Sequence, residues 1–277
     1  MNYSPFYTEE QLRTFSSREF RYVKVRKDGH ILILTLARPD KRNAFTPGMA
    51  AEIAYALGYA NWDEAIRVVV IRAEGPVFCA GADLNAFLHP EDSEPGHVPE
   101  PTATINLGEA FAGLYKPSIA QIEGSVMAGG FLILAGVTFA YSVPQAEFAL
   151  PEVKRGLWPM QVMASLSTII PPRKILEMCI TGRTYTAAEA CEMGLVTTVI
   201  PRERIAEEVM QMAIAIARNA PLAISRGLRA FRHITSETAI QHYRYLQEEL
   251  NMLLQSEDAR EGIAAFKEKR EPVWKNR

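Results

Sequence analysis

Apolar residues in the first two thirds of the chain come in short continuous runs separated by polar turns. Short apolar or β-branched runs are typical of buried strands. The Asp28-Gly29 pair between the first two runs is typical of a β-hairpin. The pattern predicts strands at Phe20–Arg26, Ile31–Ala37, Val68–Ala73, Ser118–Ile122, Thr138–Ser142 and Val196–Ile200.

Helical patterns alternate with these strands. A Thr-Pro pair at 46–47 is a typical helix start and predicts a helix that ends at about Trp62. Helices are also predicted at Thr102–Tyr115 and Gly129–Gly136, whereas residues 85–101, rich in proline and acidic residues, are expected to form a loop. Strands that alternate with helices favour parallel βα units and an α/β fold.

The pattern becomes almost wholly helical beyond Pro159, apart from the short strand near residue 198. Three or four helices are expected from Arg202 onward. The chain is therefore predicted to have an α/β core at residues 1–200 and a C-terminal helical region at residues 201–277 that packs on a neighbouring subunit.

Composition narrows the classes of function. The chain has 277 residues, 48% of them hydrophobic and 22% charged, which is enough for one sizeable core. A net charge of −2 argues against a dedicated nucleic-acid-binding protein. Three scattered cysteines form no disulfide framework, and no His, Cys or carboxylate cluster has metal-ligand spacing, so no metal and a reducing, cytoplasmic location are expected.

No secretory signal peptide and no membrane span are expected. The first 20 residues mix charges with aromatic residues. Residues 124–146 carry no charge and in principle suffice to cross a bilayer. The Gly129-Gly130 pair and Pro144 interrupt them, which favours a buried core helix followed by a buried strand.

Two motifs of small residues carry the strongest indication of chemistry. The first is Phe78–Leu84 (FCAGADL), directly after an apolar run, and the second is Glu123–Gly130 (EGSVMAGG). Small residues at the end of a strand allow a ligand to approach free backbone N–H groups. Two such groups aimed at one point form an oxyanion hole. Cys79 lies in the first motif but has no His near it in sequence, so it is interpreted as a small buried residue rather than a nucleophile.

Together with two further segments, these motifs resemble the enoyl-CoA hydratase/isomerase (crotonase) family over about residues 20–275. The four segments are Leu36–Phe45 (LARPDKRNAF), Val77–Leu84, Ile122–Gly130 and Glu261–Pro272 (EGIAAFKEKREP). The resemblance implies a crotonase-like spiral of ββα units with a C-terminal helical tail. It also implies trimers or hexamers built from two trimers, and an acyl-CoA thioester as substrate, with no separate cofactor.

The resemblance also assigns roles to individual residues. Ala82 and Gly129 match the oxyanion-hole donors, and Glu152 matches the acid/base carboxylate. Residues expected to bind CoA are Lys41, Arg42, Ala44, Ala80, Gly81, Asp83 and Leu84, with Phe266 and Lys269 reaching it from a neighbouring subunit. Structural alternatives stay open at this point: close packing at Gly129, a solvated turn at Arg42, an amphipathic tail helix, and a surface carboxylate at Glu152.

One position departs from the family pattern. Hydratases of the family typically carry a second glutamate three residues beyond the oxyanion glycine, where this chain has Leu132. Residues 158–163 (WPMQVM) also replace a glycine-rich turn that helps hold the water, leaving Gln161 as the nearest polar substitute. A drier pocket is expected. Burial of Glu152 near Trp158 would raise its pKa toward neutrality.

A single carboxylate favours double-bond isomerisation, in which one group removes a proton and returns it two carbons away. Hydration by one carboxylate is the other leading activity. Further alternatives are decarboxylation or C–C hydrolysis of an acyl-CoA, and a non-catalytic member that binds acyl-CoA or RNA. The nearly neutral net charge weighs against RNA.

Overall fold

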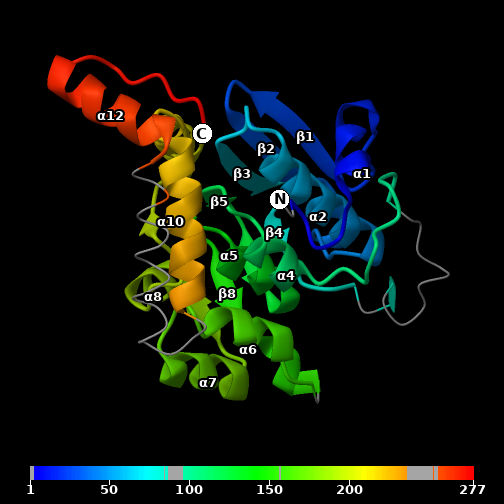
Figure 1. Cartoon of the computed structure of the whole chain (residues 1–277). Helices are drawn as coiled ribbons and strands as arrows, with labels where there is room; N and C mark the ends of the chain where they lie inside the picture. The colour runs from blue at the N-terminus through cyan, green and yellow to red at the C-terminus, as the bar shows by residue number, and fades with distance from the viewer. Residues whose placement is uncertain (1–2, 84, 87–95, 156, 236–251, 253–254) are drawn as a thin grey trace.

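The computed structural model describes residues 3–83, 85–86, 96–155, 157–235, 252 and 255–277 (Figure 1). Two sheets organise the core. The larger sheet has the order β1-β2-β3-β5-β7-β10, in which β1 is antiparallel to β2 and the other pairs are parallel. Its strands are β1 (Val23–Asp28), β2 (Ile31–Leu36), β3 (Val68–Ala73), β5 (Ser118–Ile122), β7 (Phe139–Ser142) and β10 (Thr198–Val199).

The smaller sheet has the order β4-β6-β8-β9, with only the last pair antiparallel. Its strands are β4 (Val77–Cys79), β6 (Ser125–Met127), β8 (Glu147–Ala149) and β9 (Thr184–Thr186). Successive turns of the chain give one strand to each sheet and then a helix: β3-β4-α4, β5-β6-α5 and β7-β8-α6. This repetition is the spiral of ββα units that defines the crotonase fold.

Helices surround the two sheets. In the α/β core they are α1 (Glu9–Arg13), α2 (Pro47–Trp62), α4 (Leu107–Ala112), α5 (Phe131–Gly136), α6 (Met160–Leu166), α7 (Pro172–Thr181) and α8 (Ala187–Glu192). Short 3-10 turns are η1 (Phe15–Ser17), η2 (Pro39–Lys41), η4 (Ala128–Gly130) and η5 (Pro151–Arg155). Towards the C-terminus follow α9 (Arg202–Ala217), α10 (Pro221–Ile234) and α12 (Glu257–Glu268).

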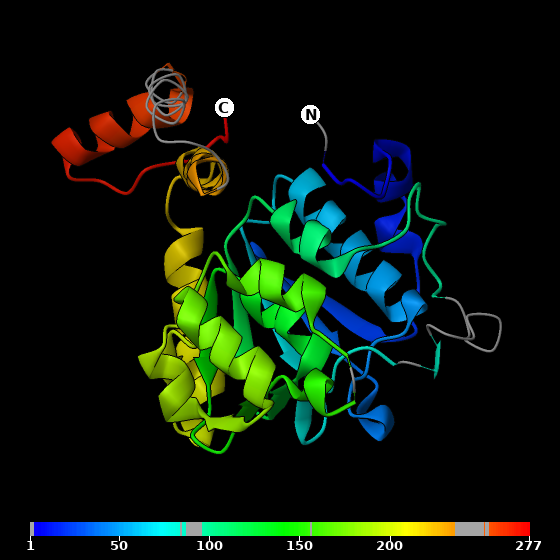
Figure 2. The same ribbon diagram turned by 90° about the horizontal axis from the view of Figure 1, so that it is seen from below.

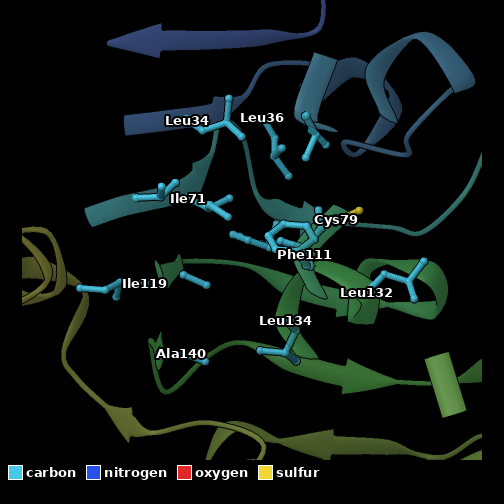
Figure 3. Packing of buried hydrophobic residues seen from close by; sticks show 14 of the residues in the cluster. Leu34, Leu36, Ile71, Cys79, Phe111, Ile119, Leu132, Leu134 and Ala140 are labelled. Carbon is cyan, nitrogen blue, oxygen red and sulfur yellow. The ribbon is translucent and has the colours of Figure 1, made fainter. Parts of the chain in front are cut away.

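The hydrophobic core lies between the larger sheet and the helices α4 and α5. Figure 3 shows Leu34, Ile71 and Ile119 from the sheet on one side, and Phe111 and Leu134 from the helices nearby. Close approach is required where α4 meets α5, since a Cβ on Gly136 would lie 2.4 Å from Cβ and Cγ of Phe111. Full burial of large side chains on this scale stabilises the fold by about 1.5–3 kcal/mol per residue.

All six predicted strands are present in the larger sheet, and the apolar runs β2 and β3 match their predicted bounds to within one residue. Strand β1 (VKVRKD) is shifted to Val23–Asp28, and β10 is shortened to Thr198–Val199. The predicted hairpin is confirmed, with Gly29 at φ +55° in the turn between β1 and β2. Strands of the smaller sheet were not predicted, because each has only three residues. The uncharged segment 124–146 contains the predicted helix, as η4 and α5, followed by the predicted strand β7. It also contains the short strand β6, which precedes the helix and was not predicted.

The predicted helix Thr102–Tyr115 is too long. Helix α4 begins at Leu107, because the Asn106 side chain accepts a hydrogen bond from the Glu109 N–H and caps the helix there. Upstream, the Thr102 N–H donates to Phe6 O at 2.9 Å and ties that segment to the N-terminal region instead. Most of the predicted loop 85–101 lies outside the described residues.

The C-terminal helices divide into two groups. Helix α9 packs on β2, β3, β5 and β7 of the larger sheet, so it completes the core. Helices α10 and α12 stand to one side of the core, in yellow-orange and red in Figure 2. Among the described residues, no helix has the length and apolar character needed to cross a membrane.

Candidate active site

Three parallel strands of the smaller sheet bring the predicted site residues to one edge. Cys79 of β4 is in register with Val126 of β6, and Val126 is in register with Phe148 of β8. Ala82 lies three residues after Cys79, and Gly129 lies three residues after Val126. Glu152 lies four residues after Phe148. Since neighbouring parallel strands end at the same edge, the segments that carry the two expected N–H donors and the carboxylate leave the sheet at that edge.

The Ala82 N–H is oriented by a backbone bridge to Phe45. The Phe45 N–H donates to Gly81 O, and the Asp83 N–H donates to Phe45 O, both at 2.9 Å. Polar groups of successive residues in an extended chain point to opposite sides. The Ala82 N–H therefore points away from Phe45, and within the described part of the chain it has no acceptor.

Gly129 lies directly against this donor. A Cβ on Gly129 would be 3.2 Å from Ala82 N, and a Cβ on Gly81 would be 2.9 Å from Gly129 N. The Gly129 N–H, like that of Ala82, donates to no acceptor among the residues that the structure describes. These two adjacent amides are therefore available to a ligand oxygen, as the expected oxyanion hole requires.

Backbone conformation is unusual just before each of these two amides. Gly81 has φ +100°, and Ala128, just before Gly129, has φ +50°. A left-handed alanine costs about 1–2 kcal/mol, so the packing around Ala128 holds it in place. Gly130 also serves close packing, because a Cβ there would lie 2.7 Å from Cys79 O. The two glycines therefore have different constraints, because Gly129 borders the Ala82 amide and Gly130 borders β4.

Glu152 lies in η5 and is half-buried, with its Oε2 atom shielded from solvent. Helix α7 packs against η5 and carries the buried Cys179. Burial first, and then the negative charge of Glu152, raise the pKa of the Cys179 thiol. The indole of Trp158 is fixed on α6, since its Nε1–H donates to Met163 Sδ at 3.4 Å.

Leu132 occupies the first turn of α5, is 4% exposed and packs towards α4. Its Cδ2 would lie 3.8 Å from a Cβ on Gly108. Gln161 is exposed and lines a cavity of about 980 Å³ between α4, α6 and α10, together with Asn106, Ser165 and Arg229. Neither Leu132 nor Gln161 thus supplies a second carboxylate beside Glu152.

The two expected CoA-binding segments lie side by side. The Ala80 N–H donates to Arg42 O at 3.0 Å, which joins the loop after β2 to the segment after β4. Lys41 and Arg42 are exposed at this junction, as a phosphate-binding role requires. Ala44 and Ala80 are partly buried beneath them.

Two other expected CoA residues belong to α12 and its end. Helix α12 lies away from β4 in both overall views (Figures 1 and 2), so one chain does not bring Lys269 to the site. This arrangement agrees with a contact made in a neighbouring subunit. Leu84 and the side chain of Phe266 lie outside the described residues.

Sequence reasoning assigned no role to two buried polar residues in the loop after β2. Arg38 Nη1 donates to Asp83 Oδ2 at 2.8 Å, and the fully buried Asn43 donates from Nδ2 to Glu74 O and Val77 O. Both residues were inside the segment Leu36–Phe45, but the three partners just named are more than 30 residues away in sequence. No local pattern reveals such partners.

Cys79 is confirmed as a buried side chain. It is fully buried, its thiol donates to Asn43 O at 3.2 Å, and burial raises the pKa of the thiol to about 12. A thiol with this pKa is almost wholly protonated at neutral pH and is a poor nucleophile.

Comparison with known proteins places this chain in a family. The family model described as enoyl-CoA hydratase/isomerase matches residues 26–277. The chain belongs to the enoyl-CoA hydratase/isomerase family. The match confirms the resemblance and the crotonase fold predicted from the sequence. It also confirms that the chain is related to enzymes that act on CoA thioesters.

Individual members of the family are similar over nearly the whole chain. An enoyl-CoA hydratase, EchA19 of Mycobacterium tuberculosis, is 35% identical, covering 91% of this chain and 96% of its own. A carnitinyl-CoA dehydratase of Salmonella heidelberg is 37% identical, covering 91% and 97%. The crystal structure of an enoyl-CoA hydratase from M. tuberculosis superposes with a TM-score of 0.82 at 28% identity, covering 92% and 99%.

Proposed function

We propose that this protein isomerises the double bond of an enoyl-CoA thioester, with Glu152 as its only acid/base carboxylate. The convergence of Ala82, Gly129 and Glu152 at the ends of three parallel strands is the observation that carries the proposal. Leu132 stands where hydratases place a second glutamate, and a buried leucine cannot polarise water. One carboxylate beside an oxyanion hole suffices to move a proton between two carbons.

The reaction has two proton transfers. Glu152 takes a proton from C2 of a 3-enoyl thioester, and the electrons of that C–H bond form a dienolate. The N–H groups of Ala82 and Gly129 stabilise the negative charge on the thioester oxygen. Glu152 then returns the proton to C4, which leaves the double bond between C2 and C3.

CoA is bound, in this proposal, along the junction of two loops. Lys41 and Arg42 carry the positive charge that nucleotide phosphates need, and residues 80–83 line the path toward the thioester. Contacts from Phe266 and Lys269 come from a neighbouring subunit. No cofactor beyond the CoA of the substrate is required by this chemistry.

Hydration is the second candidate, and the names of the relatives favour it. One relative is named enoyl-CoA hydratase and another carnitinyl-CoA dehydratase. In this reaction Glu152 alone would take a proton from water that attacks C3, and C2 would receive a proton as the enolate collapses. The same oxyanion hole would hold the intermediate.

Turnover in deuterated water separates the two reactions. The purified protein is incubated with a 3-enoyl-CoA and, separately, with crotonyl-CoA, and the products are analysed by mass spectrometry. Isomerisation gives a 2-enoyl-CoA without addition of water. The product contains deuterium whenever the Glu152 carboxyl exchanges its proton with the solvent before it returns a proton to the substrate. Addition of water to crotonyl-CoA would instead support hydration by the single carboxylate.

Self-association into a trimer, or into a hexamer built from two trimers, is part of the proposal. Several large apolar side chains are exposed on the single chain, including Met160 at 64%, Ile180 at 59% and Phe231 at 61%. Such exposure supports burial between subunits. Sedimentation equilibrium tests it: a monomer at micromolar concentration would contradict it.

A further inference from the structure

The Arg38 side chain joins the two loops that surround the expected oxyanion hole. Its Nη1 donates to Ala44 O at 2.7 Å and to Asp83 Oδ2 at 2.8 Å. Ala44 belongs to the loop after β2 that carries Lys41 and Arg42, and Asp83 follows Ala82 directly. One guanidinium group thus links the proposed CoA-binding loop to the residue beside an oxyanion donor.

The ion pair is well shielded. Side chains of Arg38 and Asp83 are only 18% and 21% exposed. Burial raises the pKa of the Asp83 carboxyl. Hydrogen bonds from Arg38 and from the Ala86 N–H lower this pKa by more than burial raises it, so the pKa lies below its ordinary value. Asp83 is therefore charged at neutral pH, and its carboxylate is directed to Arg38 rather than left available to substrate.

Arg38 is itself fixed at its backbone. Its N–H donates to Asn43 Oδ1 at 2.9 Å, and its carbonyl accepts from the Asn43 N–H at 2.9 Å. Asn43 is fully buried and also donates to two carbonyls near β4, at 2.8 Å each. The guanidinium therefore projects from a rigid loop, and Asp83 receives a fixed partner.

A largely buried ion pair is weak evidence for a role in stability, because desolvation offsets much of its attraction. Its position gives it another role. Rotation of residues 81–83 would turn the Ala82 N–H away from the thioester oxygen. The Phe45 bridge, the Arg38 contact and the longer hydrogen bond from the Ala86 N–H to Asp83 Oδ1 oppose that rotation, and of these only the Arg38 contact reaches the loop after β2 through a side chain.

We propose that Arg38 and Asp83 are positioning residues: their ion pair aims the Ala82 N–H at the thioester oxygen and couples that aim to the CoA-binding loop. The proposal rests on the function proposed above. It assigns Asp83 to orientation of the hole instead of direct contact with CoA.

The test compares Asp83→Asn and Arg38→Gln with the unaltered protein. The spectroscopic probe is butyryl-CoA with carbon-13 at the thioester carbonyl, which binds but has no double bond to move. Isotope-edited infrared spectra report the C=O stretching frequency, which falls when N–H groups donate to the oxygen. Dissociation constants are measured by calorimetry, and kcat and KM with a 3-enoyl-CoA.

Lys27→Met is the matched control. It breaks an ion pair between Lys27 and Asp63 with a distance of 2.7 Å. Lys27 is in register with Leu32, near the end of β2 opposite to the one that leads to Arg38. Lys27 is 41% exposed and Asp63 16%, so this variant reports the general effect of losing a partly shielded ion pair away from the site.

Both site variants are expected to lose part of the wild-type frequency shift and about 10- to 100-fold in kcat, with KM and the dissociation constant within about 3-fold. The control keeps all four values.

Site variants that keep the wild-type band and kcat overturn the proposal, as does weakened binding with an unchanged band. If Asp83→Asn does not fold, Arg38→Gln decides by the same measurements. A wild-type complex without a lowered C=O frequency would instead refute the oxyanion hole itself, and with it the proposed function.

Discussion

A methyl group on Gly129 is the smallest change that fills the proposed oxyanion hole. Gly129 lies in η4 outside the left-handed region of backbone conformation, so alanine is compatible with its backbone. The added Cβ would lie 3.2 Å from Ala82 N and 3.1 Å from Phe45 Cζ. The methyl group would thus contact the donor that a thioester oxygen should approach.

The size of the effect follows from these distances. An oxyanion accepts from each N–H at about 2.7–3.1 Å. A methyl carbon already 3.2 Å from Ala82 N competes for that space, so the oxygen can keep at most one good hydrogen bond. Loss of one donor costs about 10²–10³-fold in kcat, or about 3–4 kcal/mol of transition-state stabilisation. Crowding against the buried Phe45 ring should cost about 1–3 kcal/mol of folding stability.

The assay is turnover of a 3-enoyl-CoA, followed by absorbance of the conjugated product, with thermal unfolding measured on the same samples. Gly227→Ala is the matched control, since a Cβ on Gly227 in α10 would have no atom within 4 Å. That control should keep full activity and gain up to about 1 kcal/mol in stability from helix propensity. A folded Gly129→Ala protein with kcat within about 3-fold of wild type would refute the assignment of the hole.

Three further perturbations test other parts of the account. Glu152→Gln should keep butyryl-CoA binding in calorimetry but lose about 10²–10⁴-fold in turnover, and near-normal turnover would remove Glu152 from the mechanism. Burial lowers the pKa of Lys116 to about 8, so above that pH the unfolded chain binds more protons at this site and stability rises. Urea unfolding should show a rise of about 2 kcal/mol between pH 7.5 and 9.5 that Lys116→Met lacks; parallel pH curves would contradict this. Hydrogen bonding, chiefly from Arg270, lowers the pKa of Glu261 to about 2, so its contribution to the tail is present above pH 4.5 and lost as pH falls toward 2. NMR titration of this carboxyl should show that Arg270→Gln raises its pKa, and an unchanged titration would exclude the ion pair in solution.

The central strands of the larger sheet could be predicted because burial on both faces leaves a direct trace in the sequence. Strands such as Val68–Ala73 are continuous apolar runs, and their alternation with helices indicates parallel topology. The smaller sheet leaves no such trace. Strands of three residues, such as Val77–Cys79, are shorter than any periodic pattern, although they carry the site.

The backbone donors of the candidate site could be predicted from the sequence more readily than the side chains that hold them in place. Gly81 and Gly129 stand out as small residues after strands, where conformation and close approach restrict the choice of residue. Arg38 has an ordinary position in a polar loop, and its partner Asp83 is 45 residues away. Contacts across that separation depend on how the loops fold together, which no local pattern contains.

The central claim is that one carboxylate and two N–H groups move a proton along an acyl-CoA without adding water. The most direct measurement is mass-resolved turnover of a 3-enoyl-CoA and of crotonyl-CoA in deuterated water. The 3-enoyl-CoA should become a 2-enoyl-CoA with incorporated deuterium and without addition of water, and crotonyl-CoA should gain no water. Efficient hydration of crotonyl-CoA, or inertness of the 3-enoyl-CoA, would contradict it.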